Sequence, residues 1–82
     1  MNSKTISVAT PEKKAQLLQA MISCNKHTRS FASNFANSDF VKLPHVEEKS
    51  IAIWAAQRDD VTVLIWERGT DTRDWAAKIQ CW

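Results

Sequence analysis

The chain has 82 residues, of which 44% are hydrophobic and 24% charged, and its formal net charge is +2. This length allows one domain with a single small core. No apolar run approaches the roughly 18 residues that a membrane-spanning helix needs, and the first ten residues lack the apolar centre of a signal peptide, so we expect a cytoplasmic protein with no membrane partner.

The charges are distributed unevenly along the chain. Residues 1–42 carry six basic and two acidic side chains, whereas residues 43–82 carry five basic and seven acidic ones. The N-terminal half is therefore the better candidate for contact with an anion. The two cysteines, Cys24 and Cys81, are expected to be reduced thiols in the cytoplasm.

Residues 1–9 are polar without periodicity, so we expect a loose arm or a short edge segment ahead of a single domain over residues 10–82. A first helix is predicted to start at the domain boundary, where Thr10 suits the N-cap, Pro11 the first helical position and Glu12 the positive end of the helix dipole. Its apolar stripe, predicted to be buried, comprises Ala15, Leu17, Leu18, Met21 and Ile22.

A second helix is predicted over residues 28–37, with Thr28 as its cap and Asn37 as its end. The side chains predicted to form its apolar face are Phe31, Ala32, Phe35 and Ala36.

Residues 45–60 admit two interpretations, and the topology depends on the choice between them. As a helix, the segment would follow Pro44 and place Glu47 and Glu48 in its first turns, where acids favour the helix dipole. As a strand, residues 51–56 would alternate between two faces and lead into a tight turn before the next strand. The capping residue and the position of the acids favour the helix.

The C-terminal part is predicted to be a β-hairpin. Residues 61–66 are almost all β-branched, aliphatic or aromatic, and residues 75–81 alternate between apolar and polar side chains. Residues 67–74 contain Gly69, the only glycine, among charged and hydroxylated side chains typical of a turn. The predicted fold is therefore α+β and winged-helix-like, with three helices followed by a two-stranded antiparallel hairpin. The alternative is two helices plus a three-stranded meander.

This order of elements resembles a winged helix-turn-helix domain, in which a tryptophan, here Trp75, commonly opens the last strand. Three stretches, LQAMISCNK (18–26), FASNF (31–35) and AAQRDDVTVL (55–64), resemble parts of a family of small T7-type phage proteins that act on the host RNA polymerase used in stationary phase. The resemblance implies a non-enzymatic phage or mobile-element regulator of transcription in the cytoplasm of a bacterial host cell. Such a regulator would bind DNA or the host transcription machinery.

Binding to double-stranded DNA would use basic side chains near the start of the third helix and on the hairpin. The candidate contacts are Lys26, Arg29, His45, Lys49, Arg68 and Arg73. Glu47 and Glu48 would face phosphates at the same helix end, which weakens this hypothesis because neutralisation of phosphates supplies much of the affinity for DNA.

Binding to a host protein such as RNA polymerase would instead use acids and exposed tryptophans. The candidate contacts are Glu47, Glu48, Asp59, Asp60, Trp66 and Trp82. Trp54 and Trp75 are expected in the core, because a small domain needs their large apolar area. The alternative function, from another class, is an anti-defence inhibitor that binds a host nuclease or surveillance complex by protein–protein contact.

The sequence does not predict a catalytic or metal site. His27 and Ser30 would be solvated neighbours on one helical turn, without a third group to orient the imidazole. A zinc site would need ligands with a second close spacing besides that of Cys24 and His27, and the remaining candidates, His45 and Cys81, are far apart. We therefore expect a protein that is not an enzyme and has no cofactor, metal or small-molecule substrate.

Overall fold

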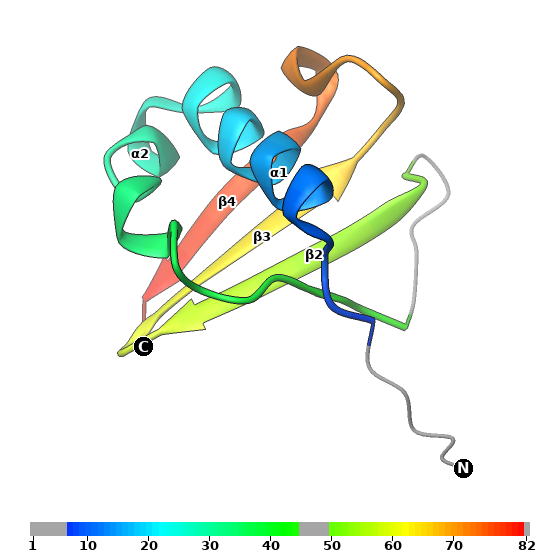
Figure 1. Cartoon of the computed structure of the whole chain (residues 1–82). Helices are drawn as coiled ribbons and strands as arrows, with labels where there is room; N and C mark the ends of the chain where they lie inside the picture. The colour runs from blue at the N-terminus through cyan, green and yellow to red at the C-terminus, as the bar shows by residue number, and fades with distance from the viewer. Residues whose placement is uncertain (1–6, 45–49, 82) are drawn as a thin grey trace, which may run out of the picture.

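Residues 7–44 and 50–81 are described by the structure, a computed structural model, and they form an α+β fold with a four-stranded antiparallel sheet (Figure 1). The strands follow one another in chain order across the sheet, so each pairs with the next. The α-helices of the described part lie on one side of this sheet. In chain order the elements are α1 (Pro11–Cys24), α2 (Lys26–Arg29), the 3-10 helix η1 (Ser33–Phe35), β1 (Val41–Lys42), β2 (Ala52–Arg58), β3 (Val61–Glu67), the 3-10 helix η2 (Thr72–Asp74) and β4 (Ala76–Cys81).

The winged-helix prediction is wrong, because residues 52–58 form strand β2 where a third helix was expected. The capping residue Pro44 and the acids Glu47 and Glu48 favoured the helix in the sequence. However, β3 is a central strand, and its backbone groups are paired on one edge by β4 and on the other by β2. The alternative fold is closer, although the meander has four strands because β1 joins it. Residues 45–49, where the predicted helix starts, lie outside the described residues.

A two-residue turn connects β2 to β3. Arg58 pairs with Val61, which leaves Asp59 and Asp60 at the tip of the hairpin. Asp59 has a φ of 55°, in the left-handed region that aspartate tolerates better than most residues. The tight turn expected from the strand interpretation is therefore present.

Helix α1 begins as predicted and buries Leu17 and Met21 of the predicted stripe, but not Ala15 or Ile22. The Thr10 hydroxyl accepts a hydrogen bond from the Lys13 backbone N–H at 3.1 Å, and Pro11 lies in the first turn. Leu18 is only half-buried, and Ile22, expected inside, is 40% exposed. Two overlapping stripes are apolar here, and only the docked sheet decides which one is covered. The buried residues of α1 are Leu17, Ala20 and Met21.

The predicted helix over residues 28–37 is interrupted and becomes α2 followed by η1. Asn25 caps α2 in place of Thr28, since its side-chain oxygen accepts a hydrogen bond from the His27 N–H at 2.8 Å. Thr28 is fully buried, and its hydroxyl lies within hydrogen-bonding distance of the backbone carbonyls of Met21 and Asn25. This hydroxyl therefore fastens α2 to the last turn of α1.

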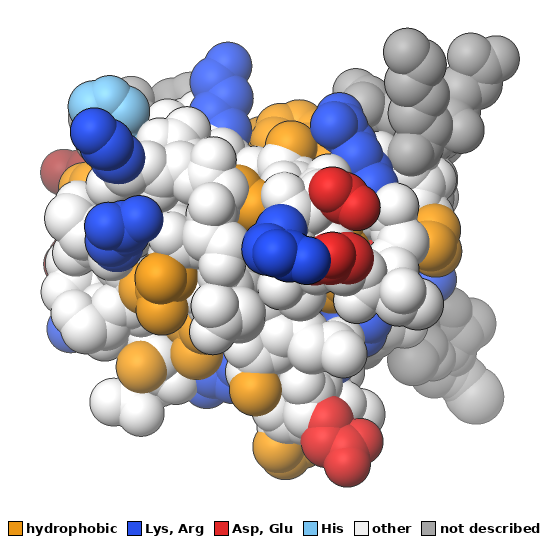
Figure 2. Space-filling model, turned by 90° about the horizontal axis from the view of Figure 1, so that it is seen from above, with side chains coloured by type: hydrophobic (Ala, Val, Ile, Leu, Met, Phe, Trp, Pro, Cys, Tyr) orange, Lys and Arg blue, Asp and Glu red, His pale blue; other side chains and the backbone are white. Residues whose placement is uncertain are grey.

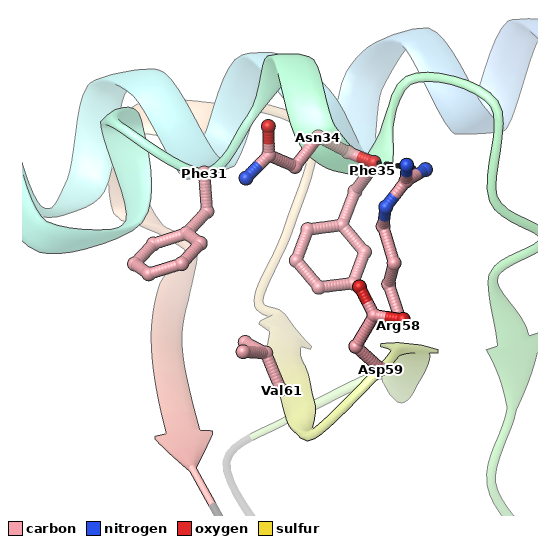
Figure 3. A pocket seen from close by; sticks show the side chains of 6 residues that line it. All are labelled: Phe31, Asn34, Phe35, Arg58, Asp59 and Val61. Carbon is pink, nitrogen blue, oxygen red and sulfur yellow. Dashed lines mark hydrogen bonds between the residues drawn. The ribbon is translucent and has the colours of Figure 1, made fainter.

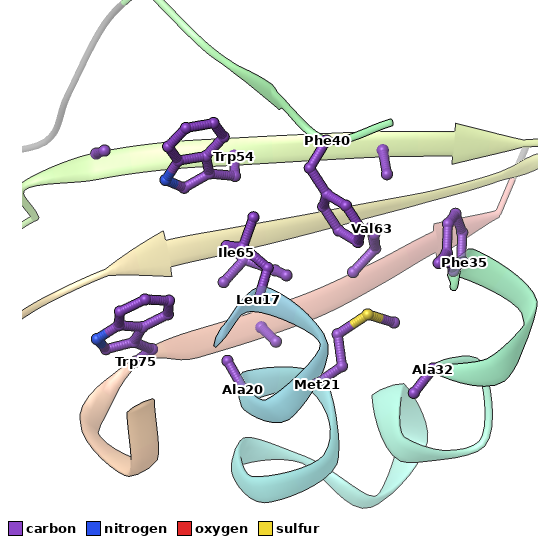
Figure 4. Packing of buried hydrophobic residues seen from close by; sticks show 13 residues of the cluster. Leu17, Ala20, Met21, Ala32, Phe35, Phe40, Trp54, Val63, Ile65 and Trp75 are labelled. Atoms are coloured by element: carbon purple, nitrogen blue, oxygen red, sulfur yellow. The ribbon is translucent and has the colours of Figure 1, made fainter. Parts of the chain in front are cut away.

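The core lies between the helices and the covered face of the sheet (Figure 4). Trp54 and Trp75 are buried, as predicted. The rings of Phe35 and Phe40 are tilted by 54° with 6.5 Å between their centres, a favourable aromatic arrangement. The largest fully buried side chains are Phe35, Phe40, Leu17, Met21, Ile65, Val63 and Thr28.

Residues 7–9 form an additional edge beside β1. Val8 bridges Val41, the Ala9 N–H donates to the Phe40 carbonyl at 2.8 Å, and the Lys42 N–H donates to the Ser7 carbonyl at 2.9 Å. The edge-segment interpretation therefore holds for this part of residues 1–9.

Candidate functional site

The side of the sheet that faces away from α1 is covered by no described helix or strand (Figure 1). Side chains on a strand alternate between faces, so the residues between the core positions of β2, β3 and β4 point to this side. We call it the uncovered face. Its members on the sheet are Val41, Ile53, Ala55, Gln57, Thr62, Leu64, Trp66, Ala76, Lys78 and Gln80.

The uncovered face is apolar at one end and polar at the other. Strand register places Ile53, Trp66 and Ala76 in one row across the sheet, with Leu64 and Ala55 in the next row. The row nearest the β2–β3 turn is polar and comprises Gln57, Thr62 and Gln80. Among the described strand positions of this face, Lys78 alone carries a charge.

Trp66 has an unusual environment on this face. It is only half-buried as a residue, yet its indole N–H is buried and has no hydrogen-bond acceptor among the described residues. Buried polar groups normally have a partner, and among the described residues this indole N–H and the Ser50 hydroxyl are exceptions. Beside it, Ile51 at the start of β2 is 61% exposed, which extends the apolar surface.

A shallow hollow of about 310 Å3 lies at the edge of the sheet, where the two-residue strand β1 pairs with only part of the outer edge of the longer β2. Its lining residues are Asp39, Val41, Ala55, Ala56, Gln57 and Thr62.

The described basic candidates for DNA contact lie in two separate segments. Lys26 and Arg29 are exposed on α2 beside His27, and Figure 2 shows Lys and Arg side chains near the histidine on this side. Arg68 and Arg73 lie in the β3–β4 connection. No recognition helix accompanies them in the described chain, and His45 and Lys49 lie outside the described residues.

Arg73 is held by a neighbouring acid. Its guanidinium donates to the Asp71 carboxylate at 3.0 and 3.2 Å. These hydrogen bonds lower the pKa of Asp71 and raise that of Arg73. A guanidinium engaged in this way has fewer free donors, so Asp71 would compete with phosphate for Arg73.

The described candidates for protein contact are also separated. Asp59 and Asp60 lie at the tip of the β2–β3 hairpin, whereas Trp66 lies near the other end of β3, about 20 Å from Asp60 at the rise of a strand. Glu47, Glu48 and Trp82 lie outside the described residues. The sequence interpretation did not select Ile53 and Leu64 as contacts. The alternation of residues 51–56 could have indicated Ile53, because it places that residue on one face of a strand.

The Cys24 thiol is free and half-buried. It lies within hydrogen-bonding reach of the backbone carbonyls of Thr72 and Trp75, so it links the end of α1 to η2. Burial, and to a smaller extent the charge of Asp74, raises the pKa of this thiol. In the described part of the chain, no three His, Cys, Asp or Glu side chains come together as metal ligands.

These features define an α+β protein in which the described helices cover one side of the sheet. No family model, curated protein or solved structure matches the chain. Among the described residues, no helix has the length and apolar character needed to cross a membrane.

Proposed function

We propose that this chain is a non-enzymatic binding protein that contacts another protein through the uncovered face. The observation that carries the proposal is the group Ile53, Leu64 and Trp66, which lies together on that face. Apolar side chains gathered on one surface are typical of protein interaction sites. An accessible tryptophan often supplies a large share of the binding energy at such sites.

The first partner to test comes from the sequence resemblance and not from the fold. It is bacterial RNA polymerase, so the activity would be regulation of transcription by protein contact. A host nuclease or surveillance complex is the alternative partner, and it would use the same face.

Double-stranded DNA is the less well supported partner. Reading a major groove requires an element that presents side chains to base edges, and residues 52–58 are a strand inside the sheet. Asp71 and Asp74 lie beside Arg73 in sequence, so the β3–β4 connection combines both charges. Because counterion release drives DNA affinity, such mixed charge favours a protein partner over DNA.

Binding of the immobilised chain to purified bacterial RNA polymerase, with and without its stationary-phase sigma factor, tests the proposal. Leu64→Thr removes apolar contact from the face and introduces a β-branched residue, which suits the central strand. Ile51→Glu adds a charge at an exposed position beside β2. We expect each change to weaken binding by about tenfold or more, as for contacts near an interface centre.

Gln16→Glu is the matched control, because it adds the same charge at an exposed position on α1, in the other layer. It should leave the affinity unchanged. If the polymerase binds but both face variants retain wild-type affinity, the uncovered face is not the contact. If the polymerase does not bind, the same variants should be compared for inhibition of host nucleases. A gel shift with random duplex DNA that weakens steeply between about 50 and 200 mM salt would instead favour DNA as the partner.

A further inference from the structure

We propose that a second site, apart from the uncovered face, binds a primary alkylammonium group such as the end of a lysine side chain. The site is a hollow of about 60 Å3 between η1 and the β2–β3 turn (Figure 3). Its lining residues are Phe31, Asn34, Phe35, Arg58, Asp59 and Val61. This inference does not depend on the proposed function.

The size of the hollow restricts its ligand. Sites for cofactors and drug-sized molecules measure roughly 300–1,000 Å3, so this hollow admits a group of only a few heavy atoms. Phe35 is 1% exposed and packs against Phe40, which makes it a fixed wall. Phe31 and Val61 are half-buried and leave apolar surface facing the hollow. The end of an aliphatic chain fits these walls.

Two opposite charges line the hollow, Asp59 and Arg58. The Asp59 side chain is directed toward the Phe35 ring at the border of the hollow (Figure 3). The ion pairs found among the described residues are Lys13–Glu67 and Arg73–Asp71, so the Asp59 carboxylate has no counter-ion there. Arg58 is the opposing charge, but its Nη1 donates to the Asn34 backbone carbonyl at 3.1 Å, which holds the guanidinium at the rim.

A primary ammonium group matches the polar atoms that remain. It has three donors and no acceptor, and the Asp59 carboxylate is an acceptor. The Asn34 carboxamide lies next to the two phenylalanine rings in Figure 3, with its oxygen turned away from them. Aromatic rings also attract a cation that lies near their faces. A lysine side chain and a free aliphatic amine share this chemistry.

Titration of the 15N-labelled full chain with n-butylammonium, followed by amide chemical shifts at constant ionic strength, tests the site. Five heavy atoms limit the affinity, so we expect a dissociation constant in the millimolar to tens-of-millimolar range. Saturable shifts should centre on Asn34, Asp59 and Val61. Neutral 1-pentanol, of nearly equal size, should bind at least about threefold more weakly, since it lacks the charge. Nα-acetyl-lysine amide is the second ligand to titrate. Its binding would show that the hollow accepts an ammonium group that is part of a lysine residue.

Asp59→Asn keeps a side chain that tolerates the left-handed backbone and removes the charge, so it should weaken n-butylammonium binding by about threefold or more. Asp60→Asn removes the same charge from the other turn residue, which does not line the hollow, and should bind like the wild type. Equal affinity of Asp59→Asn and the wild type would overturn the proposal. Tighter binding of butyrate than of n-butylammonium would also overturn it, because Arg58 would then be the group that selects the ligand.

Discussion

The Glu67 carboxylate accepts a hydrogen bond from the indole N–H of Trp54, with 2.9 Å between the two atoms. Its second oxygen lies 2.7 Å from the Lys13 ammonium, which in turn lies 5.3 Å from the centre of the Trp75 ring. The Glu67 and Lys13 side chains are only 12% and 26% exposed. One carboxylate at the end of β3 therefore joins the first turn of α1 to the neighbouring strand β2.

Glu67→Gln should lower the free energy of unfolding by about 1–3 kcal/mol, because the partly buried Lys13 ammonium loses its counter-ion while the Trp54 N–H keeps an acceptor. Urea denaturation measures the change. Asp71→Asn is the control, since it removes an exposed ion pair and keeps the capping oxygen, so stability should not change measurably. Equal effects of the two substitutions would show that the Glu67 network does not stabilise the fold.

Leu17→Ala should cost about 2–5 kcal/mol, the range for truncating a fully buried leucine. Leu18→Ala is the matched variant on the next residue of α1. Leu18 is only half-buried, so its truncation should cost less than about half as much. The difference between the two unfolding free energies tests which stripe of α1 faces the sheet, and a larger loss at Leu18 would contradict the packing in Figure 4.

Thr28→Val should destabilise the protein by about 1–2 kcal/mol, because it keeps the shape of the buried side chain but removes its hydroxyl. The Met21 and Asn25 carbonyls would lose the donor that fastens α2 to α1. Thr28→Ser keeps the hydroxyl and loses one methyl group, so it separates the hydrogen bond from packing. Thermal unfolding of both variants measures the effect, and a fully stable Thr28→Val protein would show that the hydroxyl is dispensable.

Because the pKa of Cys24 is raised in the folded state, the free energy of unfolding should vary with pH in the alkaline range. An unfolded cysteine ionises near pH 8.5, and the folded state holds the proton to a higher pH. The contribution of the neutral thiol is therefore complete below about pH 8 and declines as pH rises through the folded-state pKa. The comparison is made in a Cys81→Ser background. Between pH 7.5 and 10, values about a unit or more on each side of the unfolded thiol's ionisation, the free energy of unfolding should fall more in the protein that has Cys24 than in the Cys24→Ser variant. Equal slopes would contradict the assignment.

Residues that act within one element could be read from the sequence. Thr10 and Pro11 predicted the start of α1, and the composition of residues 61–66 predicted β3, because caps and β-branched runs act through neighbouring atoms. The burial of Trp54 and Trp75 followed from their size. For the candidate sites, the sequence selected Trp66 on the uncovered face and Asp59 at the hollow. It did not select the apolar residues in the rows around Trp66 or the aromatic residues that line the hollow with Asp59.

Tertiary structure alone decided the rest. Residues 52–58 suit a helix or a strand by local preference, and pairing with β3 makes them a strand because a central strand needs partners on both edges. The same docking chose Leu17 over Leu18 for the core. It also placed η1 against the β2–β3 turn, so that Phe31 and Asp59 line one hollow. These outcomes depend on contacts between residues far apart in the chain, whose energies exceed the small differences in local propensity that a sequence pattern reports.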